Sequence, residues 1–575
     1  MTRIPNTDIS LMIGGAAGDG TFLSGNILAR TLMREGLHVF ATNEYLSVIR
    51  GGYQWYLIRA SEREVYSQIS RVDLLVALNR DAIKRHKSLL RKDGIMIIDP
   101  KDFNNISPSP DIRLVKVPLT DFVHEVRGKR VMRNSAALGA TMAVLGYNLE
   151  TLLSVIRDVF KGREEDLKVN LLLAEKGYSH VKGDSKINSI KLKKSNKIFI
   201  TGNDAISLGA LKAGLGLYVA YPMTPASPIL HFLARVQREY EILVFQPESE
   251  IAAINIAIGA AYAGVKSMVG TSGGGFSLMT EALGLAAMSE TPIVIVVAQR
   301  PGPSTGMPTF TSQGDLRFVL HASQGEFPRV VLAPGDVEEA FYLTIKAFNI
   351  AWKYQVPVIL LTDKYLAESG KSTVLDENLI SIEEGKIIRG TYRDVIPYRR
   401  YRLTEDGVSP MALPGTKGAI VKANSSEHDE GGFVTTDPNR VVQMVDKRFR
   451  KLRELEREMK RSNPVGIYGD EEGIILISWG STKGPILEAQ NILRNQGIMT
   501  KFIHVKWLAP FPTELLVSET RNKNVIVIEN NRTGLLNSLL REHLLIDADH
   551  KILKYDGRPF YPEEIAEEVK EVANL

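Results

Sequence analysis

Residues 221–228 read Tyr221-Pro222-Met223-Thr224-Pro225-Ala226-Ser227-Pro228, with three prolines in eight positions. Each proline fixes its own φ and biases the preceding residue toward extended geometry, so the segment cannot continue a helix or a central strand. A strand-like run, residues 217–220, comes before it, and a helix-like run begins near Ile229. The segment therefore predicts a rigid strand-to-helix turn at the carboxyl edge of a sheet, where α/β folds bind ligands.

The composition of the whole chain is typical of a globular protein with several domains. At 575 residues it is too long for one core, and its 44% hydrophobic and 24% charged residues are ordinary values. The absence of cysteine excludes disulfides and any zinc or iron–sulfur site held by cysteines of this chain. The ten histidines are scattered and predict no metal site.

Charge and hydropathy restrict the partners further. The net charge of +5 comes without a basic stripe, so we expect no nucleic-acid partner. The apolar stretch 251–265 is short and bracketed by Glu250 and Lys266, which indicates a buried helix rather than a membrane span. The first residues do not have the pattern of a signal peptide, so we expect none. We therefore expect a cytoplasmic protein without a membrane segment.

Alternating strand and helix patterns divide the chain into α/β units. The first unit, residues 1–185, has expected strands at 9–13, 74–78 and 95–98 and a helix at 21–35; a polar linker follows. The second, 195–369, has expected strands at 268–270, 293–297, 330–332 and 358–361. Residues 370–470 form a charged connection with a helix at 439–460, and the last unit, 471–575, has expected strands at 474–478, 500–505 and 525–529. We expect three doubly wound parallel-sheet domains.

A glycine-rich segment, Gly14–Gly20, lies between the first expected strand and helix. Clustered glycines at a helix start expose backbone N–H groups to a phosphate, but the pattern departs from the dinucleotide fingerprint. Gly18-Asp19-Gly20 also resembles the start of a magnesium–diphosphate signature, with Asn43, in an expected polar turn, as its distal member. The spacing is short for that signature, so a tight strand-to-helix turn is the favoured interpretation.

Two arginines beside stiff turns are candidate anion ligands, because a guanidinium group offers a bidentate fork to a carboxylate or phosphate. Arg50 stands in the compact turn Arg50-Gly51-Gly52-Tyr53 and fits a surface arginine equally well. Arg300 follows the expected strand at 293–297 and precedes the loop 301–309. It therefore shares a sheet edge with the Pro-rich turn and with residues 271–279.

Glu248 and Glu250 stand at the start of a helical segment rich in alanine and glycine. Small residues permit close packing, so we expect this helix to be deeply buried. The helix dipole stabilises a carboxylate in the first turn, so an ordinary charge at the helix start is one explanation of these glutamates. However, the helix is largely apolar and follows a turn that a proline fixes. These features favour a second explanation, a buried carboxyl group that shares a proton with a ligand nitrogen.

Together these segments resemble the 2-oxoacid:ferredoxin oxidoreductases, specifically an α subunit with the γ domain fused at its N-terminus. The γ part of the resemblance rests on residues 14–20, 50–52 and 134–139. The α part rests on residues 202–205, 248–253, 271–279, 299–309, 397–401 and 427–430, and on the Pro-rich turn, which is similar to the family's Tyr-Pro-Ile-Thr-Pro motif. Met223, Ala226 and Tyr53 depart from the family's usual Ile, Ser and His.

The resemblance implies an enzyme that uses thiamine diphosphate and coenzyme A. It would decarboxylate a 2-oxoacid, pyruvate and/or 2-oxoglutarate, oxidatively to acyl-CoA and carbon dioxide and pass the electrons to ferredoxin. Residues 1–185 would be the γ domain, 195–369 the pyrimidine-binding domain and 471–575 a transketolase C-terminal-like domain. Mg²⁺, the diphosphate contacts and a 4Fe-4S cluster would belong to an obligate β subunit.

The same resemblance assigns roles to single residues. A glycine fourteen positions after the family's glutamate, here Gly264, favours Glu250 over Glu248 as the group that hydrogen-bonds the aminopyrimidine ring. Tyr221, Pro222 and Thr224 would lie beside the cofactor. Met223, Thr224 and Arg300 would contact the substrate, with Thr224 and Arg300 next to the reacting carbon. Arg50 would act on the substrate or coenzyme A side.

Two other hypotheses compete with this one. A non-redox 2-oxoacid decarboxylase or transketolase-like lyase would use the same cofactor, but the fused γ domain and the 370–470 connection argue against it. A non-catalytic scaffold is the second, and the retention of Glu250, Thr224 and Arg300 argues against that. Met223 beside Thr224 leaves the preferred 2-oxoacid open.

Overall fold

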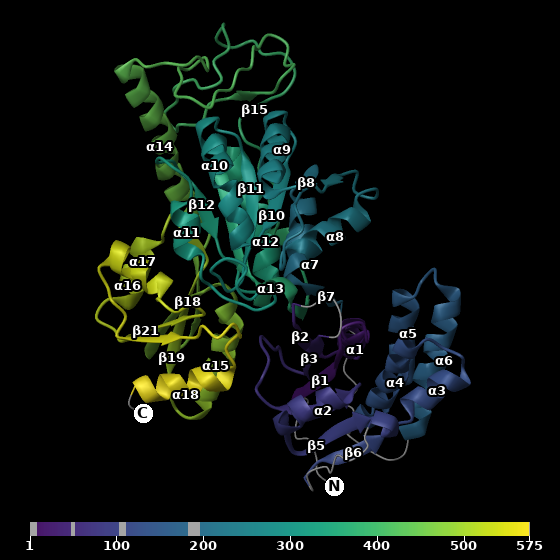
Figure 1. Ribbon diagram of the computed structural model, residues 1–575. Helices are drawn as coiled ribbons and strands as arrows, with labels where there is room; N and C mark the ends of the chain where they lie inside the picture. Colours follow the sequence, from purple (N-terminus) through teal and green to yellow (C-terminus); the bar gives the residue numbers. More distant parts are fainter. Residues whose placement is uncertain (1–7, 48–51, 103–110, 182–195, 574–575) are drawn as a thin grey trace. The chain divides into compact units, whose positions relative to one another are not determined.

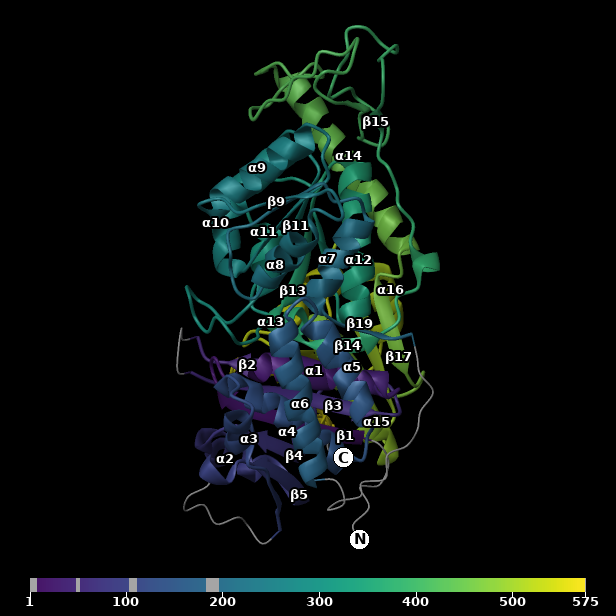
Figure 2. The same ribbon diagram turned by 90° about the vertical axis from the view of Figure 1, so that its right-hand side faces the viewer.

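The computed structural model describes residues 8–47, 52–102, 111–181 and 196–573. The chain forms two compact units. The first contains residues 1–200, 368–374 and 561–565, and the second contains residues 201–367, 375–560 and 566–575. In both units helices cover the faces of central sheets (Figures 1 and 2). The predicted α/β architecture is confirmed.

The first unit is built on an eight-stranded sheet in the order β6-β5-β4-β1-β3-β2-β14-β7. Its strands are β1 (Asp8–Ala16), β2 (His38–Tyr45), β3 (Tyr53–Ser61), β4 (Val72–Ala77), β5 (Leu90–Ile98), β6 (Arg113–Lys116), β7 (Ile198–Thr201) and β14 (Gly370–Thr373). Its helices are α1 (Thr21–Arg34), α2 (Arg80–His86), α3 (Leu119–Glu125), α4 (Arg133–Leu145), α5 (Leu149–Val159) and α6 (Glu164–Val181).

This first sheet is mixed, whereas the sequence predicted a parallel one. β1, β4, β5 and β6 pair in parallel, but β3 pairs antiparallel with both β1 and β2. The antiparallel strands β2 and β3 were not among the expected strands. Asn43 lies within β2, opposite Tyr56 of β3. The expectation of a polar turn at Asn43 is therefore wrong, because pairing with β3 overrides the local polar composition.

Helices α4 and α6 meet backbone to backbone at two glycines. A Cβ atom on Gly139 would lie 2.0 Å from the Ala174 carbonyl oxygen, and one on Gly177 would lie 1.9 Å from the Ala136 carbonyl oxygen. Every residue of α4 is buried. The segment 134–139 therefore serves the packing of this unit.

The second unit contains a seven-stranded sheet in the order β20-β12-β13-β11-β10-β8-β9. Its strands are β8 (Leu217–Val219), β9 (Leu243–Phe245), β10 (Ser267–Thr271), β11 (Ile293–Gln299), β12 (Val330–Leu332), β13 (Pro357–Asp363) and β20 (Trp507–Ala509). The associated helices are α7 (Gly202–Lys212), α8 (Ser227–Val236), α9 (Glu250–Tyr262), α10 (Gly273–Met288), α11 (Leu316–His321), α12 (Val337–Tyr354) and α13 (Lys364–Glu368).

The central strands of this sheet are parallel and buried on both faces. β11 and β13 are buried along their whole length, which explains their continuous apolar runs. α9 and α10 lie side by side against one face, where Ala253 and Phe276 share an apolar cluster with Val269 of β10 (Figures 1 and 2). Only β20 joins the sheet antiparallel among its described pairs.

A five-stranded sheet completes the second unit, in the order β17-β19-β18-β21-β22. Its strands are β17 (Val465–Gly469), β18 (Ile474–Trp479), β19 (Thr500–Val505), β21 (Val525–Glu529) and β22 (His550–Leu553), and its helices are α15 (Lys483–Asn495), α16 (Thr513–Thr520) and α17 (Leu535–Leu544). α18 (Pro562–Val572) follows β22 along the chain. The bounds of β19 and β21 are those the sequence predicted.

The connection between the two sheets of the second unit is tied to the core by buried charges. It contains the short strands β15 (Ile387–Ile388) and β16 (Met411–Ala412) and the long helix α14 (Pro438–Arg461). Lys447 of α14 donates to both carboxylate oxygens of Glu290 at 2.7 and 2.8 Å, and Lys451 lies 2.5 Å from the same carboxylate. Arg400 donates to the Glu290 carbonyl oxygen at 2.8 Å. The connection is therefore an integral part of this unit.

No helix within the described ranges is long and apolar enough to span a bilayer.

Candidate functional site

The Pro-rich turn follows β8 and leads into α8, as the sequence predicts. Two side chains from other segments fix its backbone. Asn203 of α7 donates to the Pro225 carbonyl oxygen at 2.9 Å, and Arg300 Nη1 donates to the Thr224 carbonyl oxygen at 2.8 Å. Because bonds from two directions hold neighbouring carbonyl groups, the turn is a rigid platform at the carboxyl end of β8.

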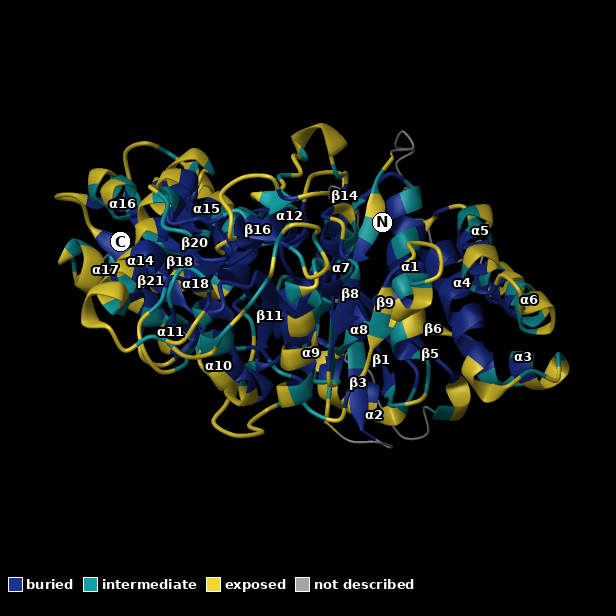
Figure 3. Cartoon of the chain, turned by 90° about the horizontal axis from the view of Figure 1, so that it is seen from above, coloured by how far each residue is buried: buried dark blue, intermediate teal, exposed yellow. Residues whose placement is uncertain are grey.

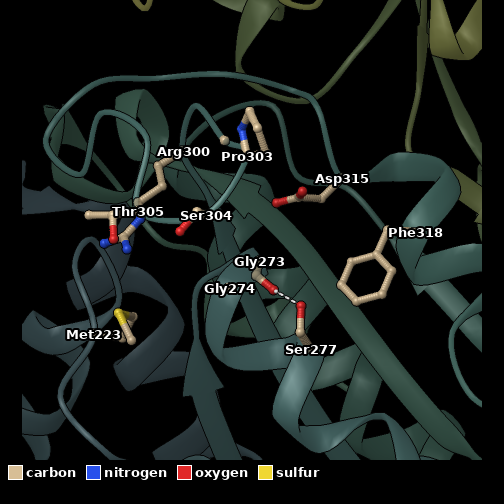
Figure 4. Close-up of a pocket in the computed structure, with 11 residues that line it drawn as sticks. Met223, Gly273, Gly274, Ser277, Arg300, Pro303, Ser304, Thr305, Asp315 and Phe318 are labelled. Atoms are coloured by element: carbon tan, nitrogen blue, oxygen red, sulfur yellow. Dashed lines mark hydrogen bonds between the residues drawn. The ribbon is translucent and has the colours of Figure 1, made fainter.

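A cavity of about 460 Å³ opens beside Arg300. It is lined by Met223, Gly273, Gly274, Ser277, Arg300, Gly302, Pro303, Ser304, Thr305, Asp315 and Phe318. Arg300 and Met223 lie on one side of it, and Asp315 and Phe318 lie on the other (Figure 4). A guanidinium group has five N–H donors, so Arg300 is able to hold the turn and still bind an anion in the cavity.

Asp315 is the charged residue of this cavity that the sequence did not predict. Burial raises the pKa of Asp315 to about 6, and the opposite charge of Arg300 acts against that shift. Burial likewise lowers the pKa of Arg300, and Asp315 opposes the change. The Asp315 amide donates to Gln299 Oε1 at 2.9 Å, across sixteen positions of sequence. No local pattern marks the residue, because the loop after β11 carries it back to the site.

Glu250 is the first residue of α9, and Ser249 caps the helix by accepting from the Ala252 amide at 3.3 Å. Glu250 is 4% exposed, and its Oε1 atom has no hydrogen-bond partner among the residues described. Glu248, the alternative candidate, is exposed. A Cβ atom on Gly275 would lie 2.5 Å from Glu250 Oε1, so the carboxyl group rests against the first turn of α10. The preceding residues of that turn, Gly273 and Gly274, line the cavity.

The structure brings most of the predicted site residues into one neighbourhood of the second unit. Met223 and Arg300 line the cavity, and Thr224 is bonded to Arg300 through its carbonyl oxygen. Tyr221 and Pro222 belong to the same turn. Arg50 lies outside the described residues, so its role stays a prediction.

The glycine-rich segment of the first unit is a closed turn. The Asp19 carboxylate accepts from the Ala16 amide at 3.1 Å, and Asn134 Nδ2 donates to the Asp19 carbonyl oxygen at 2.6 Å. Arg133 lies 3.7 Å from the Asp19 carboxylate. The chain's own groups therefore occupy this loop, as expected for a strand-to-helix turn. Over the described parts of the chain, no group of three or more His, Asp or Glu residues is arranged to hold a metal.

Comparisons with known families match most of this chain. Residues 208–447 match the family described as pyruvate flavodoxin/ferredoxin oxidoreductase, thiamine diphosphate-binding. Residues 10–180 match the family described as pyruvate ferredoxin/flavodoxin oxidoreductase. The first match contains the Pro-rich turn, Glu250 and Arg300.

Relatives and a solved structure match the chain over nearly its full length. The α subunit of 2-oxoacid:ferredoxin oxidoreductase 2 from Aeropyrum pernix is 33% identical over 98% of both chains. A 2-oxoglutarate oxidoreductase subunit from Mycobacterium tuberculosis is 31% identical over 97% of this chain and 90% of its own. The structure of 2-oxoglutarate:ferredoxin oxidoreductase from Magnetococcus marinus, with 2-oxoglutarate, coenzyme A and succinyl-CoA bound, is 34% identical with a TM-score of 0.89, over 99% of this chain and 100% of that one.

Proposed function

The chain belongs to the 2-oxoacid:ferredoxin oxidoreductases as an α subunit, and we propose that residues of its second unit bind the aminopyrimidine ring of thiamine diphosphate. The observation that carries the proposal is the Glu250 carboxyl group, buried with an oxygen that lacks a partner within the described ranges. A buried polar atom left without a hydrogen bond costs about 1–3 kcal/mol, so this carboxyl group needs donors from the chain or from a ligand. A pyrimidine ring nitrogen is a ligand of the right chemistry, so the residues fit the cofactor.

Each residue of the site then has a distinct task. Bound thiamine diphosphate supplies the nucleophilic carbon and the electron sink for decarboxylation. Glu250 shares a proton with the pyrimidine ring, and Tyr221, Pro222 and Thr224 present the Pro-rich turn to the cofactor. Arg300 binds the carboxylate of the 2-oxoacid in the cavity.

The proposed reaction joins a 2-oxoacid and coenzyme A to give acyl-CoA, carbon dioxide and one proton, while two ferredoxins each take one electron. 2-Oxoglutarate is supported by the names of the relatives from M. tuberculosis and M. marinus, and pyruvate by the names of the two matching families. Met223 lines the cavity next to Thr224 and is the residue we expect to influence this choice. A cytoplasmic location stays a prediction.

An exposed apolar face supports the need for a β subunit. The sequence predicted that α9 is deeply buried, but Ile251 and Ile256 of α9 and Leu278 of α10 are exposed. Figure 3 shows exposed stretches in both helices. A Cβ atom on Gly259 or Gly274 would meet nothing within 4 Å, so the backbone is open to close approach there. One side of α9 packs on the sheet, and the other is largely apolar and is not covered by the described residues. We place the β subunit, with the diphosphate, Mg²⁺ and iron–sulfur sites, on this face.

Co-purification with the native partner tests the proposal. We expect a cysteine-bearing partner with iron–sulfur absorption and a complex that reduces ferredoxin only with both a 2-oxoacid and coenzyme A. The rates with 2-oxoglutarate and with pyruvate, measured side by side, assign the substrate. If the chain alone decarboxylated 2-oxoacids without an electron acceptor, the redox function would be wrong.

A matched pair of charge substitutions tests the docking face. Ile256→Arg places a charge on α9, whereas Leu172→Arg places one on α6 of the first unit at similar exposure, 38% against 42%. We expect only Ile256→Arg to release the partner in size-exclusion chromatography. Equal retention of the partner by both variants would move the docking face elsewhere.

A further inference from the structure

We propose that the Thr271 hydroxyl group positions the Glu250 carboxyl group by donating a hydrogen bond to it, directly or through one water molecule. This inference rests on the proposed function, since it concerns how the same carboxyl group is held toward the cofactor. Thr271 is the last residue of β10 and belongs to none of the roles assigned above.

The two side chains converge on one glycine. A Cβ atom on Gly275 would lie 2.1 Å from Thr271 Oγ1 and 2.5 Å from Glu250 Oε1. Both oxygen atoms therefore occupy the space that a side chain at this position would need. Glycine at 275 leaves room for the hydroxyl and carboxyl groups to lie together against the α10 backbone.

Strand alternation directs Thr271 toward α9. Ser267, at the other end of β10, donates from its hydroxyl group to the Ala257 carbonyl oxygen in α9 at 2.7 Å. Residues 267, 269 and 271 face the same side of a strand, because side chains alternate with period two. Val269 accordingly shares the apolar cluster of α9. Thr271 thus faces the helix whose first residue is Glu250.

Both groups are buried and lack partners. Thr271 is 0% exposed, and neither Thr271 Oγ1 nor Glu250 Oε1 has a hydrogen-bond partner in the described chain. Leaving two buried polar atoms unsatisfied is costly, and native proteins rarely do so. A hydroxyl group donates and a carboxylate accepts, so a single bond satisfies both atoms. It also fixes the carboxyl plane, which leaves the second oxygen to face the cofactor.

The test compares Thr271→Val, which removes only the hydroxyl group, with Thr271→Ser, which keeps it. We expect Thr271→Val to weaken thiamine diphosphate binding to the assembled apoenzyme, measured by calorimetry, about tenfold or more, and to lower kcat similarly. KM for the 2-oxoacid should stay unchanged, because Arg300 and the cavity are untouched. Thr271→Ser should recover binding and kcat to within about threefold.

Thr362→Val is the matched control. Thr362, in β13 of the same sheet, is 1% exposed and its Oγ1 also has no partner within the described residues, but it is not part of the site. If Thr271→Val behaves like Thr362→Val in cofactor affinity and kcat, the proposal is wrong. Equal losses in Thr271→Val and Thr271→Ser would also refute it. Glu250→Gln separates the two claims: normal turnover there refutes the proposed function, whereas an inactive Glu250→Gln beside a normal Thr271→Val refutes only the role of Thr271.

Discussion

Glu250 and Glu290 are both buried glutamates at the ends of neighbouring helices, yet their surroundings are opposite. Glu290 follows α10 and receives two lysines on its carboxylate, with Arg400 on its carbonyl oxygen. Glu250 begins α9 and has a carboxyl oxygen without a partner in the described chain. A buried carboxylate whose cations come from the same chain is already satisfied within the fold. A buried carboxyl group left without a partner is arranged for a ligand.

The electrostatics of the Glu290 cluster show how complete its pairing is. Burial by itself would raise the pKa of Glu290, but Lys447, Lys451 and Arg400 together hold it well below its usual range. Burial lowers the pKa of Lys447 to about 7. Glu290 acts against this shift, whereas the nearby cations Lys451 and Arg400 add to it. The cluster therefore depends on its one carboxylate to balance several buried cations.

The largest expected effect is on stability and concerns Glu290. Glu290→Ala leaves Lys447 and Lys451 buried without their counterion, so we expect the free energy of unfolding to fall by about 3–5 kcal/mol. Urea unfolding of the purified chain measures this change. The exposed Glu248→Ala is the control and should change stability by less than about 0.5 kcal/mol. A loss below about 1 kcal/mol for Glu290→Ala would remove the contrast between the two glutamates.

A second prediction concerns the glycine against which Glu250 rests. Gly275→Ala inserts a methyl group into the space of Glu250 Oε1 and Thr271 Oγ1, so we expect it to displace the carboxyl group. Turnover of the assembled enzyme should fall about a hundredfold. Overpacking costs about 1–3 kcal/mol of stability, which is too little to unfold enough of the protein to explain such a loss. Gly259→Ala, on the open side of α9, should leave stability unchanged or slightly improved. Equal stability and turnover in wild type and Gly275→Ala would show that the carboxyl position is unimportant.

The smallest expected effect concerns Asp315, the carboxyl group on the opposite side of the cavity from Arg300. The pKa of about 6 means that Asp315 is neutral below pH 6 and charged above it. A negative charge there opposes an anionic substrate, so KM for the 2-oxoacid should rise about threefold as pH increases through 6. Asp315→Asn should abolish this rise. A pH-dependent KM that persists in Asp315→Asn would assign the titration to another group.

Local patterns predicted the fold better than they predicted the contacts of the site. Apolar runs identified β11, β13 and β21 because buried parallel strands need continuous hydrophobic sequence. The Pro-rich turn and Arg300 were predicted because chain stiffness and strand ends are local properties. β2 and β3 were missed, although β3 contains Tyr53, Trp55 and Ile58, residue types that favour strands.

Contacts between residues far apart in the chain could not be predicted from local sequence patterns. Lys447 and Glu290 are separated by 157 positions, and the sequence around each residue gives no indication that it pairs with the other. Asp315 reaches the cavity through a loop without a recognisable pattern. The exposed side of α9 was predicted to be buried because composition does not distinguish a core helix from one that is covered by another subunit.

The turnover of Glu250→Gln beside that of Glu248→Gln, both in the assembled enzyme, tests the central claim most directly. We expect Glu250→Gln to lose at least about a hundredfold in kcat, in the usual range for a positioned proton-sharing group, with an unchanged unfolding midpoint. Glu248→Gln should stay within about twofold of wild type. Near-normal turnover of Glu250→Gln, or equal losses in both variants, would contradict the assignment of the buried, unpartnered carboxyl group to the cofactor.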